Sequence, residues 1–185
     1  VMNKIAVSAA SGQLGSRIVR ATISLVGKQQ VVGLARTPRR AESLGVEIRP
    51  GDYEATEQLE QSLTGIDTLL LVSGMAKPDD RVQQHRNVIN AAKVAGVGKI
   101  VYTSVQGAEE NTAFSPVSQS NRQTEHDVMG SGLAWSIGRN GIYIEPDIEY
   151  LETYKRNGEI ANGAGTGKCG YTTRNELAHA YACML

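Results

Sequence analysis

The chain has 185 residues, 41% of them hydrophobic, and it carries 19 Lys and Arg against 19 Asp and Glu. This length is typical of one domain, or of one domain with a small addition, and it suffices for a sizeable hydrophobic core. The zero net charge argues against a nucleic-acid-binding protein, where a basic surplus is expected, and no apolar run approaches the ~18 residues of a transmembrane helix.

The first half of the chain alternates short apolar runs with segments of helical periodicity. In chain order we expect a strand at 4–8, a helix at 14–27, a strand at 30–35, a short helix at 38–44, a strand at 46–49, a helix at 56–63 and a strand at 67–73. Residues 69–72 are all apolar, as is typical of a strand buried on both faces of a parallel sheet.

The second half continues with a helix at 81–95, a strand at 99–104, a loop at 105–117, a helix at 119–129 and a strand at 133–139. Six strands separated by helices predict an α/β fold with a doubly wound parallel sheet of the Rossmann type. The alternation then stops, because residues 141–172 read as irregular before a helix begins at 174. We therefore expect a Rossmann domain at 1–140 and, at 141–185, the start of a smaller lobe that continues beyond Leu185.

A glycine-containing turn, Ala9-Ala10-Ser11-Gly12-Gln13-Leu14-Gly15, joins the first expected strand to the first expected helix. In such a turn Gly12 lets the backbone approach a pyrophosphate, Gly15 lets the helix pack closely on the sheet, and the helix N-terminus attracts the anion. Ala9 stands where the dinucleotide-binding pattern has its first glycine, which is tolerable if the local φ is negative. A turn that is merely structural is the alternative.

The end of the second expected strand indicates which dinucleotide is bound. An NAD site has Asp or Glu there for the ribose 2′-hydroxyl, but this chain has Arg36, followed by Arg39 and Arg40. Arginine suits a 2′-phosphate, and residues 1–41 contain no acidic side chain. The sequence therefore predicts NADP(H) as cofactor, with surface arginines at a helix start as the alternative.

Eight stretches, in order and spread over almost the whole chain, carry a family resemblance: 10–15, 51–53, 69–74, 84–93, 102–104, 124–125, 139–143 and 173–178. In them the chain resembles the NmrA-like, atypical branch of the short-chain dehydrogenase/reductase superfamily, and in particular its bacterial quinone and triphenylmethane reductases. Members of this family continue well beyond the position of Leu185, and their carboxy-terminal part helps to form the substrate cleft.

The resemblance implies a cofactor track along the carboxyl ends of the strands. It assigns Ala9, Ser11, Gly12, Gln13 and Leu14 to the pyrophosphate, Arg36 to the 2′-phosphate, Asp52 and Tyr53 to the adenine, Ser73 and Gly74 to the adenosine ribose, Thr103 to the nicotinamide, and Asn140, Gly141 and Tyr143 to the nicotinamide and the acceptor. Simpler roles remain open: Asp52 as a turn residue, Ser73 and Gly74 as a strand end, and Tyr143 as a packed ring.

The catalytic pair of ordinary short-chain dehydrogenases, Tyr-x-x-x-Lys, is missing. No tyrosine is followed four residues later by lysine, and the helix that should carry the pair reads Asn121-Arg122-Gln123-Thr124-Glu125. This argues against alcohol–ketone chemistry and against sugar epimerisation. Strongly electrophilic acceptors need less catalytic assistance from protein side chains, because the hydride donor supplies most of the chemistry. The proton comes from water or from a residue such as Tyr143, our candidate donor, with Asn140 beside it.

Two functions remain in view. The first is NADPH-dependent reduction of a quinone or a similar small electrophile, and the alternative is an NmrA-like regulatory sensor that binds NADP(H) and a protein partner without turnover. We expect no nucleic-acid or membrane partner, a monomer or homodimer, and no metal site, because the three histidines and two cysteines share no ligand spacing. Cys169 and Cys183 form neither a CxxC nor a zinc pattern, so a cytoplasmic protein with reduced thiols is expected.

Overall fold

The centre of the fold is a six-stranded parallel sheet in the order β3-β2-β1-β4-β5-β6. The computed structural model describes residues 3–107, 110–111, 114–160 and 165–185. The strands are β1 Ile5–Val7, β2 Val31–Ala35, β3 Glu47–Pro50, β4 Thr68–Val72, β5 Lys99–Val105 and β6 Ala134–Asn140. The strand order reverses between β1 and β4, so the predicted doubly wound sheet is confirmed.

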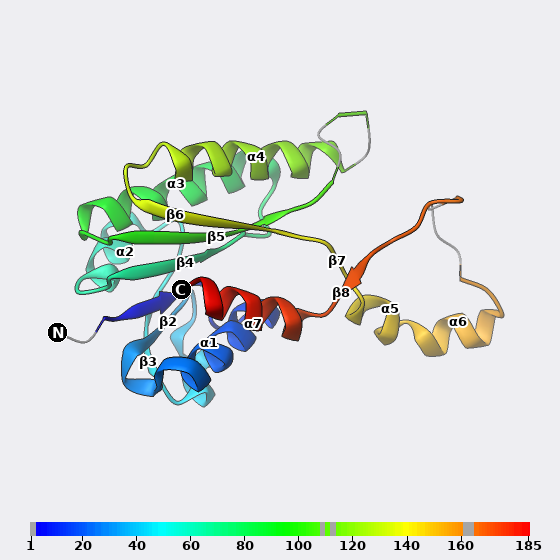
Figure 1. Ribbon diagram of the computed structural model, residues 1–185, viewed down its shortest axis with the longest axis horizontal. Helices are drawn as coiled ribbons and strands as arrows, with labels where there is room; N and C mark the ends of the chain where they lie inside the picture. The colour runs from blue at the N-terminus through cyan, green and yellow to red at the C-terminus, as the bar shows by residue number, and fades with distance from the viewer. Residues whose placement is uncertain (1–2, 108–109, 112–113, 161–164) are drawn as a thin grey trace.

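Helices cover both faces of this sheet (Figure 1). One face carries α2 Thr56–Leu63, α3 Pro78–Val94 and α4 Ser115–Met129, whose apolar side chains form a core with alternate residues of the strands. The other face carries α1 Gln13–Val26 and α7 Arg174–Met184. The short 3-10 helices η1 Lys28–Gln30 and η2 Pro38–Leu44 contact α1. Because β1 and β4 are covered on both faces, Ala6, Val7, Leu69, Leu70 and Leu71 are fully buried.

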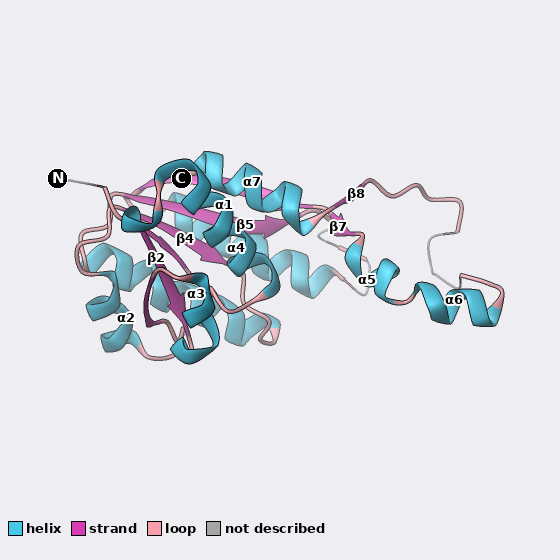
Figure 2. Cartoon of the chain, turned by 90° about the horizontal axis from the view of Figure 1, so that it is seen from below, coloured by secondary structure: helices cyan, strands magenta, loops and turns pink. Residues whose placement is uncertain are grey.

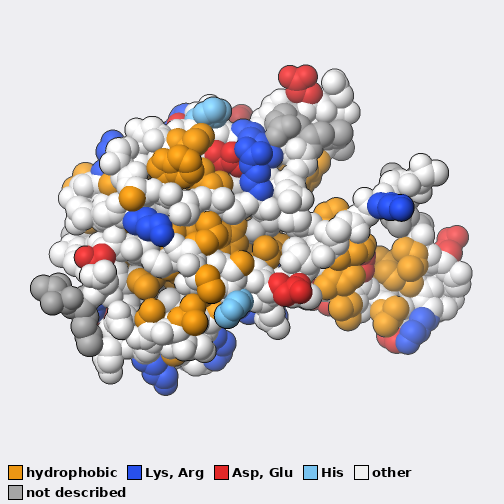
Figure 3. All heavy atoms as spheres, viewed as in Figure 1, with side chains coloured by type: hydrophobic (Ala, Val, Ile, Leu, Met, Phe, Trp, Pro, Cys, Tyr) orange, Lys and Arg blue, Asp and Glu red, His pale blue; other side chains and the backbone are white. Residues whose placement is uncertain are grey.

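The segment between β6 and α7 projects away from the sheet (Figure 1, Figure 2). It contains two two-residue strands, β7 Ile142–Tyr143 and β8 Tyr171–Thr172, which pair in parallel, and the short helices α5 Glu145–Glu149 and α6 Leu151–Asn157. Neither short helix buries a residue. Apolar side chains accordingly gather on the surface of this segment in Figure 3. Ile148 of α5, Leu151 of α6 and Tyr150 between these two helices are exposed.

Three sequence expectations differ from the structure. Helix α4 begins at Ser115, inside the expected 105–117 loop, because Pro116 is a favourable first-turn residue. Residues 141–172 were expected to be irregular, but they contain β7, α5, α6 and β8, which lack a buried face and therefore lack apolar periodicity. The expected helix at 38–44 is a 3-10 helix.

Helix α7 packs beside α1 in the same layer, and its Tyr181 belongs to the core on that face of the sheet. The division of the chain at residue 140 stays a prediction. Among the helices in the described part of the chain, none is both long enough and apolar enough to cross a membrane.

Candidate functional site

The turn between β1 and α1 lies at the carboxyl edge of the sheet, beside the switch in strand order. Two backbone bonds shape it: Ala10 N–H donates to Leu34 O at 2.9 Å, and Gly12 N–H donates to Ala9 O at 2.8 Å. Gly12 is the N-cap of α1, no side chain caps this end, and the first turn holds no acidic residue. The N–H groups of the first helical turn therefore remain available for an anion.

The two glycines of this turn are required by close backbone approach. A Cβ atom on Gly15 would lie 2.2 Å from Ala9 O, and one on Gly12 would lie 3.1 Å from the same oxygen. Ala9 itself has φ +49°, so the condition that its φ be negative is wrong. An alanine therefore adopts the left-handed conformation that the glycine of the pattern normally supplies, at a cost of roughly 1–2 kcal/mol.

Arg36 follows β2 directly and is exposed. Across the described ranges of the chain, its guanidinium has neither a hydrogen-bond nor an ion-pair partner in the protein. Arg39 and Arg40 are exposed as well, at the start of η2. This end of the sheet thus presents unneutralised positive charge one strand away from the β1–α1 turn, as a 2′-phosphate requires.

The hydroxyl of Tyr53, a residue that follows β3, is hydrogen-bonded to the ends of β1 and β4, where the strand order reverses. Its hydroxyl donates to Val72 O at 2.8 Å and lies 2.5 Å from Ser8 Oγ, which in turn accepts from Val72 N at 2.9 Å. Burial raises the pKa of Tyr53. Asp52 accepts from the Glu54 N–H at 3.1 Å, which is the geometry of a turn residue. The ring of Tyr53 packs against the core and against His85, and its contact with an adenine stays a prediction, as does that of Asp52.

The turn after β4 is held from inside the protein. Ser73 N–H donates to Thr103 Oγ1 at 2.9 Å, and the Ser73 hydroxyl donates to Asn121 Oδ1 at 3.2 Å. Gly74 N–H donates to His85 Nε2 at 2.9 Å. Both N–H groups are therefore satisfied, and Thr103 is only 2% exposed, so these residues shape the edge more than they offer donors to a ligand.

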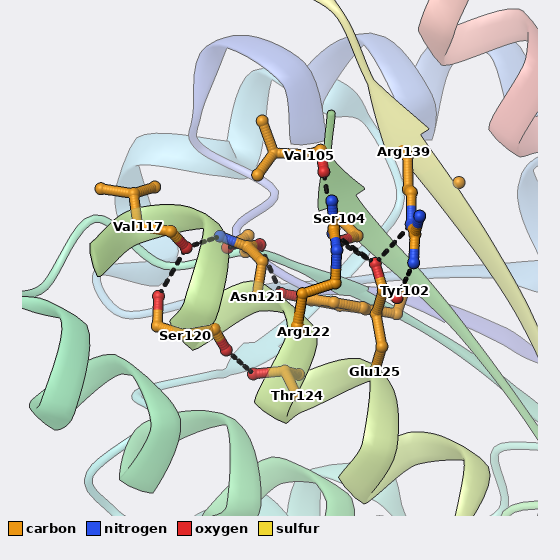
Figure 4. A network of polar contacts seen from close by, with 12 residues as sticks. Tyr102, Ser104, Val105, Val117, Ser120, Asn121, Arg122, Thr124, Glu125 and Arg139 are labelled. Atoms are coloured by element: carbon orange, nitrogen blue, oxygen red, sulfur yellow. Dashed lines mark hydrogen bonds and ion pairs between the residues drawn. The ribbon is translucent and has the colours of Figure 1, made fainter. Parts of the chain in front are cut away.

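Glu125, at the helix position where ordinary short-chain dehydrogenases are expected to have lysine, is a buried carboxylate within a polar network (Figure 4). Glu125 accepts from Ser104 Oγ at 2.5 Å, from Arg122 Nη1 at 2.8 Å, and from Arg139 Nη2 at 2.7 Å. Burial alone would raise the pKa of Glu125, but the bonds from Arg139 and Ser104 and the two positive charges outweigh it and hold the pKa below its ordinary value. Glu125 stays ionised and cannot act as a proton donor at neutral pH.

Asn121, at the position of the missing tyrosine, is an acceptor inside the same network. Its Oδ1 accepts from Tyr102 Oη at 2.6 Å, and its Nδ2 donates to Val117 O at 2.9 Å. Burial raises the pKa of Tyr102 to about 12. Tyr102 is fully buried and donates its proton to Asn121, and Glu125 is ionised, so neither group is available to protonate a bound molecule.

Tyr143 in β7 is the candidate proton donor of the sequence analysis, and this role stays a prediction. Its hydroxyl accepts a bond from Asn140 Nδ2 at 3.0 Å, and the described residues contain no acceptor for its own proton. The guanidinium of Arg174 lies over the Tyr143 ring, 4.9 Å from the centroid. Burial raises the pKa of Tyr143, although the bond from Asn140 and the charge of Arg174 oppose the rise. The hydroxyl is therefore protonated at neutral pH.

Helix α7 connects this tyrosine to the β1–α1 turn. Arg17 donates to Gln13 O at 2.6 Å, to Gln13 Oε1 at 2.8 Å and to Asn175 Oδ1 at 3.0 Å. A hydrogen bond therefore links the N-terminal parts of α1 and α7. Tyr143 lies in β7, at the start of the segment that precedes α7 in the chain. Of the other turn residues, Ser11 is exposed and Leu14 is 8% exposed.

Most predicted site residues lie at or just beyond a carboxyl end of a strand, whereas Gln13 and Leu14 begin α1 and Thr103 lies within β5. Their assignment to a cofactor stays a prediction. Gly141 lies between β6 and β7. The sequence analysis missed Tyr181, which contacts Asn140, and it did not identify Arg174 or Arg17 as contacts of the site. Only the 173–178 stretch of the resemblance pointed toward α7.

Comparisons with known proteins fit this geometry. A family model described as NAD(P)H-binding matches residues 9–185. Quinone oxidoreductase 2 of Escherichia coli is 35% identical over 98% of this chain and 63% of that protein. Triphenylmethane reductase of Citrobacter sp., solved with NADP(H), has a TM-score of 0.90 and 34% identity over 97% of this chain and 64% of that one. An E. coli NADPH-dependent quinone oxidoreductase solved with NADPH has a TM-score of 0.88 and 35% identity over 96% of this chain and 63% of that one. The chain thus spans less than two thirds of the length of these relatives.

Proposed function

The chain belongs to the NAD(P)H-binding family, and from that premise we propose that it is an NADPH-dependent oxidoreductase that reduces a quinone or a similar electrophile. The β1–α1 turn fits a dinucleotide, because a Cβ on Gly15 would meet backbone and the N-terminus of α1 has no cap. Arg36, exposed and without a protein partner in the described ranges, favours the 2′-phosphate of NADPH.

The observation that carries the reductase proposal is the hydroxyl of Tyr143. When bound, the reduced nicotinamide would supply a hydride, which is one proton and two electrons. Tyr143 Oη releases its proton to an acceptor oxygen and regains one from water, so that one quinone, one NADPH and one proton yield one hydroquinone and one NADP⁺. Asn140 holds the tyrosine oxygen during this exchange.

The absence of a Tyr-x-x-x-Lys pair limits the class of acceptor that the protein could reduce. Asn121 and Glu125 are both committed to bonds inside the network of Figure 4. An acceptor that needs strong acid assistance, such as a simple ketone, therefore finds none at these positions. A quinone needs weaker acid assistance, for which the single hydroxyl of Tyr143 suffices. The names of the relatives, a quinone oxidoreductase and a triphenylmethane reductase, favour such electrophilic acceptors.

To test the proposal, the protein is mixed with NADPH and tetramethyl-benzoquinone, and the reaction is monitored by the absorbance of the reduced nicotinamide. A fully substituted quinone is used because Cys169 and Cys183 are exposed and would add to an unsubstituted ring. We expect protein-dependent loss of NADPH, slower with NADH and absent without protein. Binding of NADPH without consumption, tested also with a triphenylmethane dye, would favour the sensor instead. A cytoplasmic monomer or homodimer stays our expectation.

A further inference from the structure

We propose that Tyr181 of α7 is a positioning residue that fixes the direction of the hydrogen bond between Asn140 and Tyr143, and so keeps the proton of Tyr143 available for transfer. The proposal rests on the proposed function in giving Tyr143 the role of proton donor. The hydrogen-bond arrangement itself does not depend on any activity and can be measured without cofactor.

Three side chains form a directional chain. Tyr181 Oη lies 2.6 Å from Asn140 Oδ1, and Asn140 Nδ2 lies 3.0 Å from Tyr143 Oη. Tyr181 is 2% exposed and Asn140 is 5% exposed, so neither can replace a lost partner freely with bulk water. The hydroxyl of Tyr181 has one proton and faces two acceptors, Asn140 Oδ1 at 2.6 Å and Gly138 O at 2.9 Å. The shorter contact gives this proton to Asn140 Oδ1, which leaves the Asn140 nitrogen facing Tyr143.

In the reversed orientation of Asn140, the proton of Tyr143 would be held in a hydrogen bond and would not be available to the reaction. If its oxygen faced Tyr143, the tyrosine hydroxyl would donate to that oxygen and would no longer have its proton free. Without the Tyr181 hydroxyl, Asn140 Oδ1 would be a buried acceptor with no donor, which costs about 1–3 kcal/mol. Rotation of the amide toward Tyr143 relieves this cost, so loss of Tyr181 favours the reversed arrangement.

The backbone of β6 is shaped to admit Tyr181. A Cβ atom on Gly138 would lie 2.4 Å from Tyr181 Oη and 2.7 Å from its Cε1 and Cζ atoms. The absence of a side chain at Gly138 therefore lets the ring lie against the strand, where its hydroxyl also lies 2.9 Å from Gly138 O. The ring is positioned by packing, and only its oxygen is needed to orient Asn140.

Helix α7 thus fixes Tyr143 in two ways. Arg174 in its first turn lies over the tyrosine ring, and Tyr181, two turns later, reaches the hydroxyl through Asn140. The charged and titratable groups that face Tyr143 are Arg174, which lowers its pKa, and Glu145 of α5, which raises it. Glu145 also pairs with Arg174 at 3.8 Å. Tyr181 has a raised pKa because of burial, so it acts as a neutral donor at working pH.

The test is Tyr181→Phe in the full chain, with Tyr150→Phe as the matched control because Tyr150 is 59% exposed on the projecting segment. Tyrosine ring carbons are labelled with ¹³C and titrated by NMR without cofactor, and Tyr143→Phe identifies the Tyr143 signal. In the proposed arrangement the Asn140 nitrogen stabilises the ionised tyrosine. Tyr181→Phe should therefore raise the pKa of Tyr143 by about one unit, while Tyr150→Phe leaves it unchanged.

Steady-state kinetics supply the second readout. Tyr181→Phe should lower kcat about tenfold, the equivalent of one pKa unit, and leave the KM for NADPH unchanged. Asn140→Asp provides a second variant, because a carboxylate accepts from both tyrosines and should likewise raise the pKa of Tyr143. Unchanged Tyr143 titration and unchanged kcat in a folded Tyr181→Phe protein would overturn the proposal. If the wild type reduces no acceptor, the proposed function fails alone, and the titration still decides the role of Tyr181.

Discussion

Buried, neutral His85 makes the stability of this protein depend on pH in a defined window. Its Nε2 accepts from Gly74 N–H at 2.9 Å, so the ring proton is on Nδ1, which donates to Thr124 Oγ1 at 2.9 Å. Thr124 donates onward to Ser120 O at 3.1 Å. A second proton on Nε2 would oppose the Gly74 N–H. Burial, and secondarily the charge of Arg81, lower the pKa of His85 from 6.5 to about 3.

The sign and size of the effect follow from this pKa. Between pH 6.5 and about 3 the unfolded chain binds a proton at His85 that the folded chain does not, so stability falls as the pH falls. At 1.36 kcal/mol per unit, the free energy of unfolding should drop by about 2 kcal/mol between pH 7.5 and 5.0.

Urea unfolding at the two pH values, followed by circular dichroism, measures this drop. His85→Gln should lose most of it, although the variant is less stable at pH 7.5. His126→Gln, which removes an exposed histidine of α4, should retain the drop of the wild type. The same drop in His85→Gln and in the wild type would refute the assignment of a buried neutral His85.

Three further changes test the β1–α1 turn and the cofactor preference. Arg36→Ala should weaken NADPH binding at least about tenfold and leave NADH binding within about twofold, since only NADPH carries the phosphate that a charged hydrogen bond of about 1.5–3 kcal/mol would hold; fluorescence titration with both cofactors measures this, and equal losses would contradict it. Gly15→Ala places Cβ 2.2 Å from Ala9 O, so it should abolish NADPH binding and lower the free energy of unfolding by about 1–3 kcal/mol, whereas the control Gly98→Ala, with its nearest atom at 3.5 Å, should retain full binding. Ala9→Gly relieves the strain of a left-handed alanine, and this gain opposes the entropic cost of ordering a glycine. The free energy of unfolding should therefore stay constant or rise by up to about 1 kcal/mol. A decrease of about 1 kcal/mol in urea unfolding would show that Ala9 is not strained.

The sheet could be predicted from the sequence because its signals are local. Apolar runs such as 69–72 mark strands buried on both faces, and the glycines after Val26 and Val94 mark helix ends. The comparisons confirm the family resemblance, which also rests on short local motifs. The short helices α5 and α6 escaped prediction because they bury nothing, so no periodicity marks them.

The contacts of the site were harder to foresee. The positive φ of Ala9 follows from the approach of α1 to the turn, which no local pattern reveals. Tyr181 and Asn140 are 41 residues apart in the chain. Their contact depends on α7 packing beside α1 and on the missing side chain at Gly138, both of which are long-range consequences of the fold.

The most direct test of the account is to quantify both products when NADPH and tetramethyl-benzoquinone are mixed with the wild-type protein and with Tyr143→Phe. The account predicts one NADP⁺ per hydroquinone with the wild type. With Tyr143→Phe it predicts a rate lower by at least about a hundredfold, as expected on loss of a general acid, with unchanged affinity for NADPH. Equal turnover and equal pH dependence in the two proteins would contradict the role of Tyr143. Tight NADPH binding by the wild type with neither product formed would contradict the reductase itself.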